Sequence, residues 1–247
     1  MKTAFFADIH ANREALEACL RHAEKLQIDR YAFLGDLIGY GADPSWAIDT
    51  VMDYHSRGAI VLLGNHDEAV LSRPEMSMHD DARYVVSWTR SQLSTAQMNF
   101  LKELPLVFDK YEMFMTHANV FKPQGWEYVT NVIDAKKSFS ATFDRFIFCG
   151  HLHEPVLYHQ GATGKVVQFI PVAGVDIPMG ITRRWLAVIG SVGQPRDINP
   201  AACYAIYDSS RNTLTYFRVP YDIATASKKI ADAGLPVWLG DRLERGV

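Results

Sequence analysis

The chain has 247 residues, of which 48% are hydrophobic, so it is long enough to bury a full core. Its formal net charge of −3 disfavours wrapping a long nucleic acid or lying on an anionic membrane surface. No apolar run approaches the roughly 18 residues that span a bilayer. The apolar run 4–7 ends at Asp8, unlike a signal peptide, and the cysteines at 19, 149 and 203 lie too far apart for a disulfide framework or a metal motif. We therefore expect a cytoplasmic protein with reduced thiols.

The first third of the chain alternates predicted strands and helices. Short apolar runs predict strands over 3–7, 31–34 and 59–63, and apolar residues at helical spacing predict helices over 13–26 and 44–54. Asp43 and Pro44 supply an N-cap and a first-turn proline for the second helix. This alternation indicates an α/β fold, in which ligands bind beyond the carboxyl ends of the strands.

The rest of the chain combines helices with antiparallel strands. The patterns predict a helical segment over 79–103 with a break near Ser94, a hairpin of 106–108 and 112–116, a helix over 131–143 and a strand over 146–149. After Pro155, turn sequences at 161–164 and 208–212 predict short antiparallel strands, followed by a final helix near 223–233. Since no repeat, low-complexity segment or linker interrupts the sequence, we predict a single domain over 1–247, with 79–103 as a cap-like element within it.

Polar residues gather where the predicted strands end. They are Asp8 and His10 after the first strand, Asp36 after the second, Asn65, His66 and Asp67 after the third, His117 after the hairpin, and His151 and His153 after the strand 146–149. Each group alone is a weak signal, because a polar turn or the entry to a helix explains it equally well. His151 and His153 are a stronger one, since alternate residues of an extended segment project to the same side.

Together these residues supply imidazoles, carboxylates and one amide oxygen to a single edge of a sheet. Such nitrogen and oxygen donors suit manganese, iron, zinc, nickel or cobalt better than a structural zinc site rich in thiolates. One four-coordinate ion would leave several donors unused, whereas two ions bridged by a shared carboxylate use them all. We therefore predict two divalent transition-metal ions, with manganese favoured.

The order of these motifs resembles that of the calcineurin-like metallophosphoesterases. The matching stretches are Asp8-x-His10, Gly35-Asp36, Gly64-Asn65-His66-Asp67, the isolated His117 and Gly150-His151-x-His153. Further stretches at 35–41, 88–90, 126–129 and 190–197 are similar to a bacterial branch of compact predicted phosphodiesterases. The sequence departs from the family in Ala11, where glycine is usual, and in Val188-Ile189, where Asn-Pro is common. The resemblance implies a two-sheet β-sandwich flanked by helices, in four layers of the order α/β/β/α.

The resemblance also implies a role for each residue of the motifs. By motif position, the first ion is held by Asp8, His10 and His153, the second is held by Asn65, His117 and His151, and Asp36 bridges the two. His66 is not a ligand but faces the substrate as the general acid. Asp67 lies behind His66, where it fixes the ring and its charge.

These roles predict a dinuclear metal-dependent phosphoesterase that attacks a phosphodiester or phosphomonoester with a metal-activated hydroxide. Two cations neutralise the phosphoryl oxygens, and a protonated imidazole assists the leaving alkoxide. We expect a small, nucleotide-type substrate, because no basic stripe is present to bind a polymer. A phosphoprotein phosphatase and a dinucleoside polyphosphate hydrolase remain alternatives. A nuclease and a non-catalytic binding scaffold are less favoured, the latter because no motif residue is missing.

Four further residues are candidates for contacts with the substrate. Tyr40 or Trp126 would stack on a nucleobase, and Arg196 would contact a phosphate. Asn12 is the fourth candidate for a contact with the substrate. For the aromatic residues Trp88, Trp126 and Tyr84, packing in the core or between helices is the alternative interpretation.

Overall fold

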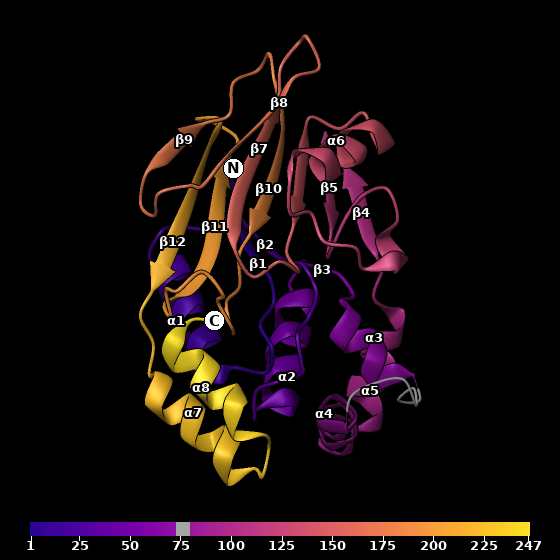
Figure 1. The fold of residues 1–247 in the computed structure, drawn as a ribbon, viewed down its shortest axis with the longest axis vertical. Helices are drawn as coiled ribbons and strands as arrows, with labels where there is room; N and C mark the ends of the chain where they lie inside the picture. The colour runs from indigo at the N-terminus through magenta and orange to yellow at the C-terminus, as the bar shows by residue number, and fades with distance from the viewer. Residues whose placement is uncertain (73–79) are drawn as a thin grey trace.

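Two six-stranded sheets pack face to face in the computed structural model, which describes residues 1–72 and 80–247 (Figure 1). The first sheet has the strand order β3 (Ile60–Val61), β2 (Arg30–Phe33), β1 (Lys2–Phe6), β11 (Ala202–Asp208), β12 (Thr213–Val219) and β9 (Asp176–Pro178). The second has the order β4 (Val107–Lys110), β5 (Met113–Thr116), β6 (Phe146–Cys149), β10 (Arg184–Ile189), β7 (Pro155–Gln160) and β8 (Val166–Phe169). Both sheets mix parallel and antiparallel pairs.

Helices cover the outer faces of both sheets and extend below them in Figure 1. The first sheet packs against α1 (Arg13–Glu24) and α2 (Pro44–Ser56), and the second against α6 (Val132–Ala141). The remaining helices are α3 (Asn65–Leu71), α4 (Asp80–Ser91), α5 (Thr95–Glu103), α7 (Ile223–Asp232) and α8 (Val237–Arg245), with a short 3-10 turn at Pro123–Gly125. The predicted α/β/β/α layering is therefore confirmed.

The apolar run at the start of the chain builds two cores at once. Successive side chains of a strand point to opposite faces of the sheet, so Phe5 and Phe6 pack in different layers. Phe5 stacks on Phe148 of the second sheet, with ring centroids 4.1 Å apart. Phe6 faces the helices and stacks on Tyr204 at 5.1 Å. Burial of each phenylalanine contributes about 1.5–3 kcal/mol to the stability of the fold, so both faces of β1 anchor it in the sandwich.

The directions of five strands bring the predicted polar clusters to one edge. β1, β2 and β3 run parallel to one another in the first sheet, and β5 runs parallel to β6 in the second. The His151 N–H donates to Asp8 Oδ2 at 2.9 Å and ties the two sheets together at this edge. Within the second sheet, the Gly150 N–H donates to the His117 carbonyl at 2.9 Å. We call the loops that follow these five strands the carboxyl edge.

Most predicted elements are present, with three differences. The third strand is shorter than predicted, at Ile60–Val61, the helix α3 follows it where none was predicted, and the final helix is followed by another, α8. Pro236 precedes α8, Leu239 and Leu243 form its buried stripe one turn apart, and Gly246 closes it with a φ of 67°. The prediction placed the final helix near 223–233 and assigned no element to the residues that follow it.

The segment predicted as helical over 79–103 contains α4 and α5, separated by Ser94, which caps α5. Its first residue, His79, lies outside the described residues. Across the described parts of the chain, none of the helices combines the length and the apolar character needed to cross a bilayer. All three cysteines are free and buried, as predicted.

Candidate metal centre

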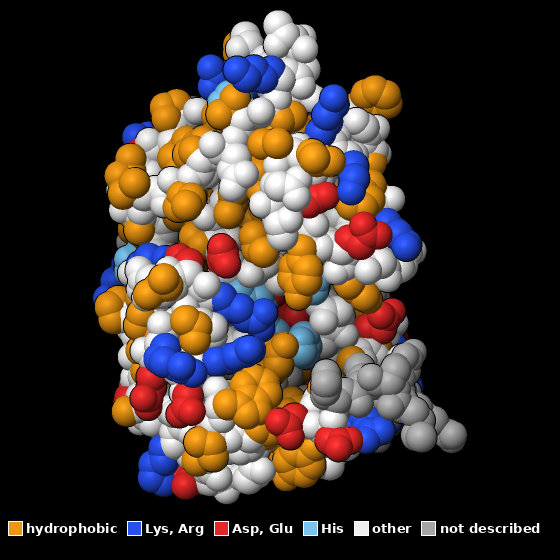
Figure 2. Space-filling model, in the orientation of Figure 1, with side chains coloured by type: hydrophobic (Ala, Val, Ile, Leu, Met, Phe, Trp, Pro, Cys, Tyr) orange, Lys and Arg blue, Asp and Glu red, His pale blue; other side chains and the backbone are white. Residues whose placement is uncertain are grey.

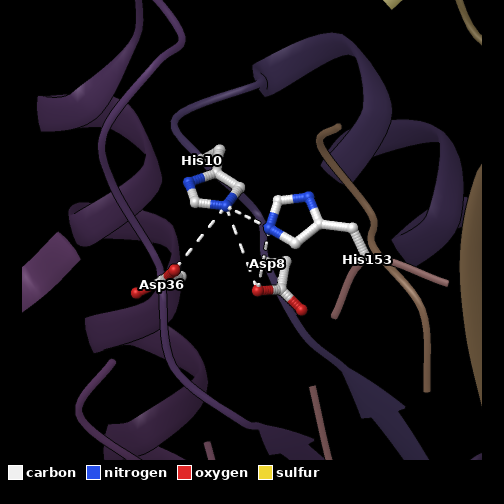
Figure 3. A group of neighbouring side chains, drawn as sticks. All are labelled: Asp8, His10, Asp36 and His153. Carbon is white, nitrogen blue, oxygen red and sulfur yellow. Dashed lines mark hydrogen bonds and ion pairs between the residues drawn. The ribbon is translucent and has the colours of Figure 1, made fainter. Parts of the chain in front are cut away.

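Four side chains from three separate loops converge at the carboxyl edge. Ligand atoms of Asp8, His10, Asp36 and His153 all lie within 4.8 Å of one another (Figure 3). His10 Nε2 lies 3.1 Å from His153 Nε2 and 3.7 Å from Asp36 Oδ2. His153 Nε2 lies 3.3 Å from Asp8 Oδ1. The spacing suits one small cation at the centre of the group.

A second group lies beside the first and shares Asp36 with it. Ligand atoms of Asp36, His117 and His151 lie within 4.8 Å of one another. His117 Nε2 lies 3.4 Å from Asp36 Oδ2, 3.1 Å from His151 Nδ1 and 3.1 Å from Asn65 Oδ1. Asp36 Oδ2 thus lies between a histidine of each group, where a bridging carboxylate oxygen would be.

Main-chain carbonyls orient the four histidines. A neutral imidazole has a single N–H, so a nitrogen that donates to a carbonyl leaves the other nitrogen with a lone pair. In all four rings the outer nitrogen faces a carbonyl and the inner nitrogen faces the group, an arrangement typical of metal-bound histidines. The outer contacts are His10 Nδ1 to Ile38 O at 3.2 Å, His117 Nδ1 to Leu34 O at 2.8 Å, His151 Nε2 to Trp126 O at 2.8 Å and His153 Nδ1 to Gln194 O at 2.6 Å.

The inner atoms fit a cation and little else. Inner nitrogens only 3.1 Å apart repel each other when both carry lone pairs, unless a proton or a metal ion lies between them. Asp8 Oδ1 is buried and has no hydrogen-bond partner among the described residues, although a buried polar atom without a partner is costly. The donor set therefore fits metal ions in both groups.

Burial and mutual charge shift the pKa values of these groups. Burial opposes ionisation of Asp36, but His117 and His66 outweigh it and hold the pKa of Asp36 well below its usual range. Burial likewise opposes protonation of His117, yet the Asp36 carboxylate raises the pKa of His117 to about 9. Burial and the neighbouring His117 lower the pKa of His151 to about 4. Positive charge is thus favoured beside Asp36, where the two groups meet.

The loops of the carboxyl edge hold an unusual concentration of left-handed backbone. Such φ values cost roughly 1–2 kcal/mol for residues other than glycine, and they gather at functional sites. Ala11 has a φ of 51°, so the position where the family usually has glycine keeps the conformation that glycine favours. The other site-forming residues with positive φ are Asp8, His10, Asp36, Tyr40, Trp126, His151 and His153.

Two motif glycines allow the loops to approach closely. A Cβ at Gly64 would lie 2.1 Å from the Asp36 main-chain nitrogen, and one at Gly150 would lie 2.6 Å from Asp8 Oδ2. No side chain fits at either position without moving a carboxylate of the centre. This explains why glycine precedes both Asn65 and His151.

His66 lies at the mouth of the centre and not among the inner donor atoms. Its main-chain N–H donates to Asp36 Oδ1 at 2.8 Å, which fixes the start of α3 against the Asp36 carboxylate. Its ring meets His10 edge-on at 5.0 Å and lies 4.4 Å from the Tyr40 ring. Burial lowers the pKa of His66, while the Asp36 carboxylate opposes that shift.

Asp67 differs from its predicted role behind the His66 ring. Its carboxylate accepts N–H groups from Leu37 at 2.9 Å, Ile38 at 3.2 Å and Gly64 at 2.9 Å. Burial and the nearby Asp36 raise its pKa, and these hydrogen bonds oppose that rise. Asp67 thus joins the loops that follow β2 and β3, and it positions His66 through the backbone.

Three of the four predicted substrate contacts lie beside the centre. Tyr40 packs against the His10 ring at 4.6 Å as well as against His66, and the Arg196 guanidinium lies 5.7 Å from the Tyr40 ring. Trp126 lies on the other side, with its ring 5.8 Å from that of His117. Its Nε1–H donates to Glu68 Oε2 at 2.8 Å, which ties the indole to α3.

Asn12 does not face the centre. Its Oδ1 accepts the Ala15 N–H at 3.1 Å and caps α1, and its Nδ2 donates to the Gly193 carbonyl at 2.8 Å. Only 4% of the residue is exposed. Asn12 therefore holds a loop to a helix, and the geometry gives no support to its predicted contact with substrate.

Three residues near the centre were not singled out from the sequence. Tyr128 stacks on His151 with centroids 4.1 Å apart, and it is 46% exposed. Trp238 and Arg242 lie on α8, the helix that the prediction missed. The sequence feature that could have indicated Tyr128 is its position in the aromatic stretch 126–129. The feature that could have indicated α8 is the helical spacing of Leu239 and Leu243.

Comparisons with known proteins agree with this geometry. A family model described as the calcineurin-like phosphoesterase superfamily domain matches residues 1–212. The uncharacterised protein MJ0912 of Methanocaldococcus jannaschii is 31% identical over 257 residues, which cover 98% of this chain and 97% of that protein. The crystal structure of a metallophosphoesterase from Sphaerobacter thermophilus has a TM-score of 0.89 at 33% identity, covering 100% of this chain and 99% of that chain.

A hypothetical protein from Pyrococcus horikoshii OT3, PH1004, shares the fold at a TM-score of 0.81 and 19% identity, covering 100% of this chain and 98% of that chain. The family model spans the five strands whose ends form the carboxyl edge, and every motif residue of the resemblance lies within it. The predicted resemblance is confirmed: this chain belongs to the calcineurin-like phosphoesterase superfamily.

Proposed function

We propose that the protein is a dinuclear metal-dependent phosphoesterase. The observation that supports this most directly is the position of Asp36 Oδ2, 3.7 Å from His10 Nε2 and 3.4 Å from His117 Nε2. In this proposal Asp36 bridges two ions. The remaining ligands are Asp8, His10 and His153 for one ion and Asn65, His117 and His151 for the other.

The ions would be divalent transition metals, with manganese the first candidate among manganese, iron, zinc, nickel and cobalt. When bound, they supply positive charge to phosphoryl oxygens and lower the pKa of water. Asp8 and Asp36 bring the negative charge that attracts them into a buried site. The outward hydrogen bonds of the histidines turn their inner nitrogens toward the ions, and each inner nitrogen must be free of its proton when an ion binds.

His66 is the proposed general acid for the leaving group. It flanks the centre without sharing its inner atoms, and the negative charge of a phosphoester would favour its protonated ring. Asp67 holds the backbone of the surrounding loops, so that His66 stays at the mouth. Tyr40 and Arg196 flank the same mouth and would contact the organic part and the phosphate of the substrate.

The substrate is proposed to be small and of nucleotide type. A cavity of about 640 Å³ opens beside His66 and Tyr40, and α4 forms its opposite wall with Ala82, Val85 and Val86. The volume suits one nucleoside-sized group. Helix α4 would thus be the part of the predicted cap-like segment 79–103 that lines the substrate cavity.

A substrate panel tests the proposal. Protein stripped with chelator should be inactive, and manganese, nickel or cobalt should restore hydrolysis of bis(p-nitrophenyl) phosphate, nucleotides or dinucleoside polyphosphates. Activity on phosphopeptides alone would support the phosphatase alternative. Two tightly bound ions without hydrolysis of any ester in the panel would contradict the enzyme and support a binding scaffold.

A further inference from the structure

Two arginines, Arg196 and Arg242, lie against Tyr40 and Trp238, aromatic residues that line the cavity beside the metal centre. Arg196 follows β10 and lies against Tyr40, with its guanidinium 5.7 Å from the ring. Arg242 lies on α8, with its guanidinium 4.7 Å from the ring of Trp238. Figure 2 shows basic side chains gathered over α8, next to histidine side chains in the middle of this face.

Both arginines are held in place by the fold. The Ile198 N–H, two residues after Arg196, donates to the Gly246 carbonyl at the end of α8 at 2.8 Å. At the other end of α8, Trp238 Nε1–H donates to Asp81 Oδ2 of α4 at 3.0 Å. Helices α4, α7 and α8 also share a small apolar core that includes Val85, Ile230 and Leu243, so α8 is a fixed wall.

Neither guanidinium has an acidic partner among the described residues. Arg196 donates to the neutral Gln194 Oε1 at 2.8 Å. By contrast, Arg218 pairs with Asp197, the residue next to Arg196. Burial and the positive charge of Arg196 lower the pKa of Arg242, which is the expected effect of two cations held near each other. Like charges kept together without a carboxylate are typical of sites that bind an anion.

The cavity beside these arginines has a different character. Tyr40 and Trp238 form part of its wall, and the apolar side chains of α4 form another part. Asp80 and Asp81 also line it. Asp80 pairs with Arg83 and Asp81 accepts the Trp238 N–H, and their remaining carboxylate lone pairs can accept N–H or O–H groups. The side of the mouth that holds Arg196 and Arg242 therefore suits phosphate. The cavity suits a neutral group with hydroxyl or amino donors.

We propose that Arg196 and Arg242 form an anion subsite that binds a second phosphate group of the substrate, while its organic group occupies the cavity between Tyr40 and Trp238. The proposal rests on the proposed function and narrows its substrate class to organic phosphoesters with at least two phosphate groups. Arg242 acts here as a specificity residue and takes no part in the chemistry.

Calorimetric titration of the manganese-loaded protein tests the subsite. The probes are AMP and the non-hydrolysable adenosine 5′-(α,β-methylene)diphosphate, which differ by one phosphonate group. A charge-assisted hydrogen bond contributes about 1.5–3 kcal/mol, so the wild type should bind the diphosphate analogue at least about tenfold more tightly. R242Q should reduce this preference about tenfold, and R242K should restore part of it.

R245Q is the matched control, because Arg245 is exposed on the same helix and its substitution removes the same charge. This variant should keep the full preference for the diphosphate analogue. Equal affinity of the wild type for both probes, or an unchanged preference in R242Q with an unchanged melting temperature, would overturn the subsite. Hydrolysis of bis(p-nitrophenyl) phosphate by the wild type distinguishes a failure of the subsite from a failure of the proposed function. A wild type that does not hydrolyse this ester would count against the proposed function itself.

Discussion

The carboxyl edge and the helical rim, which comprises α4, α7 and α8, surround the same mouth but are built in opposite ways. At the carboxyl edge His10 is 1% exposed and His117 is not exposed at all, and each ring is oriented by a main-chain carbonyl. At the rim Trp238 is 37% exposed, and Arg242 lacks an acidic partner among the described residues. We therefore assign the proposed chemistry to the buried carboxyl edge and the proposed choice of substrate to the more exposed helical rim.

This contrast separates the expected effects of substitution. A change at the carboxyl edge should harm every substrate, because it alters the centre or its supports. A change at the rim should alter the affinity for some substrates and spare others.

The largest effect is expected at His66. A general acid contributes 10²–10⁴-fold, or roughly 3–5 kcal/mol of the barrier. His66→Ala should keep its metal content but lose about that factor on an alkyl or nucleoside ester. The loss should be much smaller on a nitrophenyl ester, whose leaving group departs as a stable anion. Steady-state kinetics on both esters measures the difference.

His55→Ala is the control for His66, because His55 is exposed on α2, outside the site, and its loss should change neither rate. A metal-free His66→Ala protein would make His66 a ligand. An equal loss on both esters would also count against its role as the acid.

Asp67 should affect stability more than leaving-group dependence. Asp67→Ala leaves three buried N–H groups without their acceptor, and each unsatisfied group costs about 1–3 kcal/mol. We expect the free energy of unfolding to fall by about 3 kcal/mol or more, which would lower the melting temperature by roughly 6–12 °C. An unchanged melting temperature with a strong dependence on the leaving group would restore the role predicted from the sequence, as direct support of the ring.

The smallest effect is expected at Tyr40. Stacking on a base contributes about 1–3 kcal/mol, so Tyr40→Leu should raise KM for a nucleoside substrate about tenfold and spare a small aryl diester. Trp126→Leu should not discriminate between them, because its indole is tied to Glu68 and packs near His117. A selective rise of KM in Trp126→Leu, and none in Tyr40→Leu, would assign the stacking role to Trp126.

The sequence predicted the carboxyl edge well because its residues directly follow strands. Asp8, Asp36 and His117 each come after an apolar run, and parallel strands bring their ends to one edge. The partners of Asp67 and Asn12 were not predictable in this way. Their hydrogen bonds go to backbone groups up to 181 residues away, and residue type alone does not specify such partners.

Helix α8 of the rim was missed for a different physical reason, although α4 and α7 were predicted. The core of the rim is formed by α7 and α8 together with Val85 of α4, which is far away in the sequence. A helix as short as α8 depends on such tertiary packing more than on its own propensity. The chain also contains no motif that links Arg242 to Arg196, because their segments come together only when the end of α8 docks on the loop after β10.

Metal stoichiometry tests the central claim most directly, because the claim is that Asp36 serves two ions at once. Elemental analysis of the manganese-reconstituted wild type should give two ions per chain. Asp36→Asn should weaken both sites and leave far less than one ion, whereas His117→Ala should keep close to one. Asp53→Asn, at an exposed ion pair on α2, should keep two. Two ions retained in Asp36→Asn, or a single ion in the saturated wild type, would contradict the account.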